Sequence, residues 1–279
     1  MKVFISVDME GITALTDPED VLPEGSDYQR GRVFMTRDAN AAIKGAFDAG
    51  ATEVLVNDSH WIMRNLLIEQ LDSRARVIKG FHKPMCMVQG LDETFDAAVF
   101  IGYHSCAGTE GGVLNHTLLG KEVQNLLLEG EPIGETRLNS LLAGHHGVPV
   151  AFVAGDRAVC AEATRVLGDG LETFAVKDGI DMFTAECLHP DVTEKGIRDG
   201  VAKALGASGR EAHRVEAPYT FAFEWNSTTI ASTCELIPDV RKPTPRTTEF
   251  TTESLPEAMG LIFTQLLLAL QVGQKGIYS

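Results

Sequence analysis

The first twelve residues, MKVFISVDMEGI, constrain the fold more than any other stretch of the chain. Residues 3–7 are mostly apolar and β-branched, which predicts a buried strand of a parallel sheet. This strand ends in Asp8-Met9-Glu10-Gly11, and an extended segment points Asp8 and Glu10 to the same side. Ligands of open parallel sheets bind beyond the carboxyl ends of the strands, so this tip is a candidate site. The alternative is a solvated acidic turn.

Strand and helix patterns then alternate, which predicts an α/β fold with a mostly parallel, Rossmann-like sheet and flanking helices. Residues 13–30, rich in Asp, Pro, Gly and Glu, are expected to form a long loop. A helix is predicted from Thr36, as its N-cap, to Gly50. The remaining elements expected in this half are strands over 53–58, 76–78, 97–103 and 148–154, a hairpin over 123–133, and helices over 136–144 and from 157 to 167.

From Leu171 the pattern changes. A short strand over 174–177 and a helix over 192–205 precede residues 217–225, whose alternation suits an antiparallel strand. An extended segment over 249–253 and a helix over 255–271 complete the chain. We therefore expect two domains, a metal-binding catalytic α/β domain over 1–188 and a smaller α+β domain over 189–279.

Polar side chains follow three of the predicted strands. Asp8 and Glu10 follow the first, Asp58 and His60 the second, and His104 the strand over 97–103. If these strands are parallel, all three tips lie at one edge of the sheet. Each histidine taken alone is better explained as a core or loop residue, but their shared position favours a site.

A fourth segment adds a carboxylate, because Glu135 lies at a helix start, where the helix dipole favours negative charge. Zinc binds imidazole nitrogen and carboxylate oxygen, and a carboxylate can bridge two ions. The absence of thiolates favours a catalytic over a structural site. The sequence thus predicts a two-metal site made of Asp8, Glu10, His60, His104 and Glu135.

Neighbouring residues have weaker predictions. Asn57 and Asp58 are candidates for orienting the His60 ring, because a ligating imidazole usually donates its second N–H to a carboxylate or carbonyl. Cys106 is expected to be a loop thiol rather than a ligand. The other histidines are expected to be structural: His82, His145, His146, His189 and His213.

Charge and cysteine content limit which partners and which cellular compartment can be expected for this protein. The net charge of −15, from 39 acidic and 24 basic residues, argues against nucleic acid, and the few cations near the strand tips argue against phosphate. Five cysteines without CxxC pairing predict reduced, mostly buried thiols in the cytoplasm. We expect no secretory segment and no membrane span, because the apolar stretch 261–272 is short and interrupted by polar residues.

Five motifs, in order and with similar spacing, resemble those of the D-aminopeptidases first associated with bacterial dipeptide-transport operons: Ser6-Val-Asp-Met-Glu-Gly11, Asn57-Asp-Ser-His60, Gly102-Tyr-His104, Asn115-His116 and Gly134-Glu135. The resemblance extends in order to about residue 156 and more faintly to the end of the chain. It implies a two-zinc metallopeptidase that assembles into a homodecameric ring admitting short peptides. It also implies that Asp8 bridges both ions, Glu10 and His60 bind one, His104 and Glu135 bind the other, and His116 is catalytic without binding metal.

The expected reaction is release of the N-terminal residue of a short peptide by a hydroxide that bridges two zinc ions. D-residues such as D-Ala are the expected preference, and His116 would relay a proton or stabilise the tetrahedral intermediate. Three alternatives stay open: an aminopeptidase for L-amino-acid or Gly peptides on the same site, a metal-dependent phosphoesterase, and a non-catalytic peptide-binding protein. Manganese or cobalt could replace zinc.

Overall fold

The computed structural model describes residues 1–273, and its larger sheet has seven strands. In spatial order they are β3 (Arg76–Ile78), β2 (Glu53–Asp58), β1 (Lys2–Val7), β4 (Ala97–Tyr103), β7 (Val150–Asp156), β8 (Glu172–Asp181) and β9 (Thr184–Cys187). Every neighbouring pair is parallel except β8 and β9. The predicted mostly parallel α/β sheet is confirmed.

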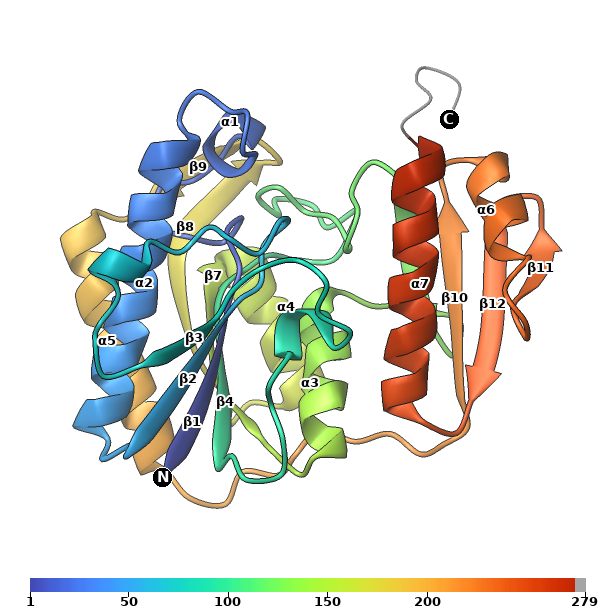
Figure 1. The fold of residues 1–279 in the computed structure, drawn as a ribbon. Helices are drawn as coiled ribbons and strands as arrows, with labels where there is room; N and C mark the ends of the chain where they lie inside the picture. The colour runs from blue at the N-terminus through green and yellow to red at the C-terminus, as the bar shows by residue number, and fades with distance from the viewer. Residues whose placement is uncertain (274–279) are drawn as a thin grey trace.

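Helices cover both faces of this sheet (Figure 1). On one face lie α2 (Tyr28–Asp48) and α5 (Pro190–Gly206), and on the other α3 (Glu135–His145) and α4 (Arg157–Leu167). The two-residue period of β1 explains the two layers, because Val3 and Ile5 pack in the core beneath α2 and α5 while Phe4 packs in the core beneath α3. Two short 3₁₀ helices, Ile68–Gln70 and Cys86–Val88, lie in the connections.

The smaller sheet is antiparallel, as predicted for residues 217–225. Its order is β11 (Arg241–Thr244), β12 (Thr247–Thr252), β10 (Tyr219–Trp225), β5 (Val123–Leu128) and β6 (Glu131–Pro132). The predicted hairpin over 123–133 is present, and Glu129 and Gly130 at its turn have φ of 52° and 80°. A short helix, α6 (Thr228–Cys234), follows β10.

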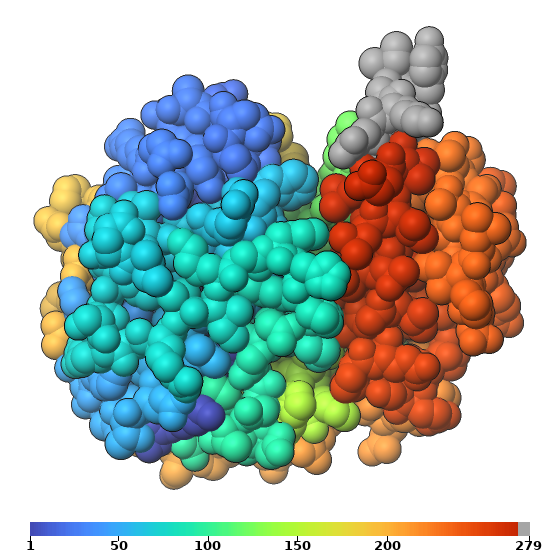
Figure 2. Space-filling model, viewed as in Figure 1, coloured from blue at the N-terminus to red at the C-terminus, as the bar shows by residue number. Residues whose placement is uncertain are grey.

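Helix α7 (Leu255–Gly273) lies between the small sheet and α3 (Figure 1). In the space-filling view its side chains lie against the teal segment near residue 80, where the Phe81 and Phe263 ring centroids are 6.0 Å apart (Figure 2). Buried Ile262 and Leu266 belong to the same apolar core as Phe100 of the large sheet. The two sheets therefore share a core through α7.

The apolar stretch 261–272, expected to be too short to span a bilayer, lies within the longer helix α7. Residues Leu255–Val272 form a helix that is long and apolar enough, with a mean hydropathy of 1.5. Helices buried in the core of a globular protein pass the same test, and α7 packs on both β10 and α3. Core packing explains the composition of this helix.

The segment after β1 differs from its prediction. The expected loop over 13–30 contains a helix, α1 (Pro18–Val21), with Asp17 in a capping box. Helix α2 begins at Tyr28, and Thr36 is no N-cap but lies inside the helix, where its hydroxyl donates to the Arg32 carbonyl at 2.8 Å.

The two sheets do not divide the chain at residue 188. Helix α5, which follows that residue, packs on α2 and β8 of the large sheet, whereas β5 and β6, which precede it, belong to the small sheet. The division into domains over 1–188 and 189–279 stays a prediction, and residues 274–279 of the second lie outside the described part of the chain.

Candidate metal centre

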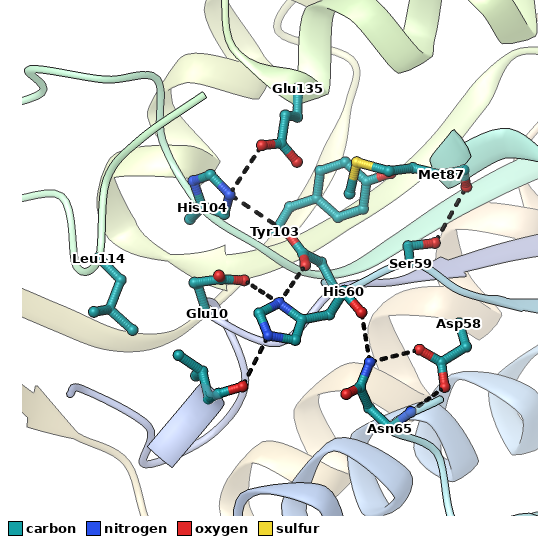
Figure 3. Close-up of polar contacts among 12 residues, drawn as sticks. Glu10, Asp58, Ser59, His60, Asn65, Met87, Tyr103, His104, Leu114 and Glu135 are labelled. Carbon is teal, nitrogen blue, oxygen red and sulfur yellow. Dashed lines mark hydrogen bonds and ion pairs between the residues drawn. The ribbon is translucent and has the colours of Figure 1, made fainter. Parts of the chain in front are cut away.

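The predicted ligands converge at the carboxyl edge of the large sheet (Figure 3). Asp8 and Glu10 follow β1, His60 follows β2, and His104 follows β4. Glu135 is the first residue of α3, after Gly134 as N-cap. All five side chains are buried.

Asp8 lies between the two histidines. Its Oδ1 is 3.4 Å from His60 Nδ1, and its Oδ2 is 3.5 Å from His104 Nε2. His60 Nδ1 is also 3.0 Å from Glu10 Oε2, and His104 Nε2 is 3.4 Å from Glu135 Oε1. The arrangement is two imidazole–carboxylate pairs joined by a shared carboxylate.

The second nitrogen of each ring contacts a main-chain carbonyl. His60 Nε2 lies 2.9 Å from the Val21 carbonyl, and His104 Nδ1 lies 3.1 Å from the Ser105 carbonyl. A carbonyl only accepts, so these nitrogens carry hydrogen. In the neutral rings, His60 Nδ1 and His104 Nε2 then point lone pairs at carboxylate oxygens.

Acceptors that face one another need a proton or a cation between them. Among the described residues, buried Asp8 Oδ2 and His104 Nε2 have no hydrogen-bond partner. Two sets of potential ligand atoms lie within 4.8 Å of one another, Asp8 with Glu10 and His104, and His104 with His116 and Glu135. Imidazole and carboxylate donors without thiolate fit zinc ions.

The pKa values report a strongly negative potential. Burial and the neighbouring Glu10 raise the pKa of Asp8 to about 8. Burial opposes ionisation of Glu10, but the three histidines around it, His60 above all, together hold the Glu10 pKa well below its usual range. Burial lowers the pKa of His104, yet the carboxylates of Glu135, Glu10 and Asp8 together raise it well above the ordinary value. The potential that protonates these rings also attracts divalent cations.

His116 lies beside this cluster. Its ring stacks on that of His104, with centroids 4.1 Å apart and planes 10° apart. Its Nδ1 donates to the Leu114 carbonyl at 2.8 Å, which leaves the lone pair on Nε2, 3.9 Å from Glu10 Oε1. Burial and the adjacent His104 lower the pKa of His116, so the ring is a neutral base. Its side chain is 20% exposed, so a substrate can reach it.

Asp58, a candidate for orienting the His60 ring, points away from that ring instead. The Asp58 carboxylate accepts from the main-chain and side-chain nitrogens of Asn65, and the Asn65 amide donates to the His60 carbonyl at 2.7 Å (Figure 3). Asn57 is also turned away from the ring, and its amide donates to the Met87 carbonyl at 2.8 Å. The ring is oriented instead by Val21, in a segment predicted as loop.

The thiols agree with their predictions. All five cysteines are free, and Cys86, Cys160 and Cys234 are buried. Cys106 accepts a hydrogen bond from the Thr117 hydroxyl at 3.8 Å and belongs to neither set of potential ligand atoms within the described residues.

Sequence analysis did not predict that Lys177 lies next to the metal cluster. The signal available was a lysine that directly follows the apolar residues 174–176 of a strand, which indicates a buried cation. Only 1% of Lys177 is exposed, and its Nζ donates to three main-chain carbonyls behind the cluster.

A buried set of histidines and carboxylates at the carboxyl edge of a parallel α/β sheet, with a free imidazole beside it, defines a metal-dependent hydrolase. Residues 1–264 match the model of the peptidase M55 family, described as D-aminopeptidase. The chain belongs to this D-aminopeptidase family, as its motifs indicated.

The chain is similar in sequence and in structure to D-aminopeptidase from Bacillus subtilis. A D-aminopeptidase of strain 168 is 43% identical over 205 residues, which are 74% of each chain. The solved structure of the Zn-dependent D-aminopeptidase DppA, described as a self-compartmentalizing protease, matches with a TM-score of 0.93 and 36% identity over 97% of this chain and 98% of that one. These matches confirm the predicted fold and the enzyme class.

Proposed function

We propose that this protein is a zinc-dependent D-aminopeptidase that releases the N-terminal residue of short peptides. The observation that carries the proposal is the pair of buried imidazoles whose ring nitrogens face three carboxylates, with Asp8 between them. The zinc dependence and activity of the similar Bacillus enzyme support it.

Asp8 would hold both metal ions, with Glu10 and His60 on one and His104 and Glu135 on the other. The distances support this pairing, since each histidine nitrogen lies within 3.4 Å of its own glutamate. When bound, zinc ions act as Lewis acids that acidify water and polarise a carbonyl. The main-chain carbonyls of Val21 and Ser105 each accept the other ring N–H of a histidine and so fix the tautomer of that ring.

His116 is the proposed proton carrier. The Leu114 carbonyl accepts a hydrogen bond from the Nδ1–H of His116. The other nitrogen, Nε2, is therefore the atom that accepts a proton and passes it to the leaving amine. The stacking on His104 fixes the ring plane next to the ligands. The depressed pKa keeps Nε2 unprotonated before the reaction, as a proton acceptor requires.

The assembly and compartment belong to the same proposal. The similar enzyme is self-compartmentalizing, and we propose a homodecameric ring for this chain as well. Five free cysteines support a reducing, cytoplasmic environment.

The test is amino-acid release from paired D-Ala-led and L-Ala-led dipeptides, with purified protein before and after chelation and zinc restoration. We expect chelator-sensitive release from the D-led peptides. Release from the L-led peptides alone would reverse the stereochemical assignment, and release of phosphate from phosphoesters with no peptide cleavage would refute the aminopeptidase.

A further inference from the structure

Lys177 is a cation buried inside the large sheet, 1% exposed and without a role in the proposed reaction. It lies on β8, opposite Asp156 of β7. Strands β4 and β7 separate β8 from β1, which carries the first two ligands. The side chain nevertheless reaches the turn that follows β1.

Its ammonium group uses all its hydrogens on that turn. Nζ donates to the Glu10 carbonyl at 2.6 Å, to the Ile12 carbonyl at 2.9 Å, and to the Leu15 carbonyl. An ammonium has three donors, so its hydrogen-bonding capacity is filled by main-chain acceptors. Glu10 contributes its carbonyl to Lys177 and its carboxylate to the metal cluster, so one residue connects the two.

The turn is fixed on its other side by β4. The Asp8 N–H donates to the Ile101 carbonyl at 2.8 Å, and the Gly11 N–H donates to the Gly102 carbonyl at 2.8 Å. These bonds fix the start of the turn, whereas Lys177 fixes its later part. Without Lys177 the Glu10 and Leu15 carbonyls lose this donor, and the Ile12 carbonyl keeps only the Leu15 N–H, 3.3 Å away.

Charge gives a second reason for a cation here. Asp8, Glu10 and Glu135 place three carboxylates in one buried cluster, and like charges repel. Buried lysines are rare unless they are paired. Burial lowers the pKa of Lys177 to about 8, while the carboxylates of Asp156, Asp38 and Glu10 favour its charged form. A fixed ammonium behind the turn offsets part of the repulsion.

We propose that Lys177 is a positioning residue of the metal centre, which holds the turn over residues 10–15 so that Asp8 and Glu10 face His60 and His104. The proposal rests on the proposed zinc site. A residue of β8, far from the ligands in sequence, thus positions the ligands before metal binds.

The test compares zinc affinity, by competition with a chromophoric chelator, in the full-length wild type and in Lys177→Met. We expect the substitution to weaken zinc binding by about 10- to 100-fold, the usual effect of losing a group that orients ligands. Amide hydrogen exchange should accelerate over residues 10–15 and remain unchanged in α7. With zinc at saturation, kcat should fall more than KM changes.

Two control variants separate positioning from general stability. Lys44→Met makes the same chemical change at a residue that forms an ion pair with Glu194. Ile262→Ala opens a cavity in the apolar core on which α7 packs. Both should retain wild-type zinc affinity. Lys177→Gln, a smaller change with a remaining donor, replaces Lys177→Met if that variant does not fold, and at least a tenfold loss is expected.

Wild-type zinc affinity and local exchange in a folded Lys177 variant would overturn the positioning role while the zinc enzyme stands. A wild-type protein that binds no zinc would overturn the proposed function, and the positioning role with it.

Discussion

His116→Ala separates catalysis from metal binding most directly. His116 Nε2 is 3.9 Å from Glu10 Oε1, too far for a hydrogen bond, and its other nitrogen contacts a main-chain carbonyl. General acid–base catalysis by one side chain is worth roughly 10²- to 10⁴-fold in rate. We therefore expect kcat to fall by that factor, or about 3–5 kcal/mol of transition-state stabilisation.

The stability cost of the same change is small. The variant loses one hydrogen bond to Leu114 and the stacking on His104, each worth about 1 kcal/mol. A loss of about 2 kcal/mol lowers the Tm of a chain of this size by about 4–8 °C. The protein therefore remains folded at the temperature of the assay.

The assay pairs initial rates on a D-Ala-led dipeptide with zinc content by mass spectrometry. His104→Ala serves as the ligand control and should lose zinc, while His146→Ala, at a partly exposed residue outside the cluster, should change neither quantity. Because the His116 side chain is partly exposed, free imidazole should restore part of the activity of His116→Ala. Loss of zinc in proportion to activity would show that His116 is a ligand, and a kcat within threefold of wild type would refute its role altogether.

Three further predictions concern metal, packing and pH. Chelation should abolish peptidase activity and lower Tm, and restoring zinc to about 1,000 times its Kd should return about 4 kcal/mol of stability, measured by calorimetry; an unchanged Tm would contradict the site. Gly11→Ala places a Cβ 1.9 Å from the Tyr103 carbonyl oxygen, so we expect a loss of about 3 kcal/mol in urea unfolding together with weaker zinc binding. Burial raises the pKa of Asp38 to about 6, although the hydrogen bonds that Thr13 donates to its carboxylate act to lower that pKa. Between pH 4 and 6 the unfolded chain has then released a proton that the folded chain keeps, so stability falls by about 3 kcal/mol as pH rises, and Asp38→Asn should remove this slope from urea titrations.

The strands of the large sheet were predictable because burial on both faces leaves a continuous apolar run. Residues 97–103 are the clearest case, and all seven are buried in β4. Their tips were predictable for the same reason, since polar residues can only begin where the run ends. This is why five separated motifs led to one edge of one sheet.

Assignment of elements to sheets was not predictable in the same way. Leu126 of β5 pairs with Phe223 of β10, almost a hundred residues later, and no local period indicates which distant strand a hairpin will join. The start of α2 was not predictable because its first turns contain a residue that disfavours helices. Gly31, a poor helix former, lies where a Cβ would come within 2.2 Å of the Asp20 carbonyl oxygen, so packing against α1 requires the residue that obscured the helix.

The orientation of the three site histidines depends on groups that carry no sequence signal. His60, His104 and His116 each donate a ring N–H to a main-chain carbonyl, of Val21, Ser105 and Leu114 respectively. Every residue has a carbonyl, so these acceptors are specified by where the chain runs and not by which side chain it bears. A side-chain substitution at any of the three leaves the acceptor in place, and its effect depends on whether the backbone moves. The segment that presents the Val21 carbonyl is also the one joined to the turn that Lys177 holds. The path of this connection therefore contributes to the site as much as the ligands do, and it is encoded by α1, by its cap at Asp17 and by contacts across the sheet.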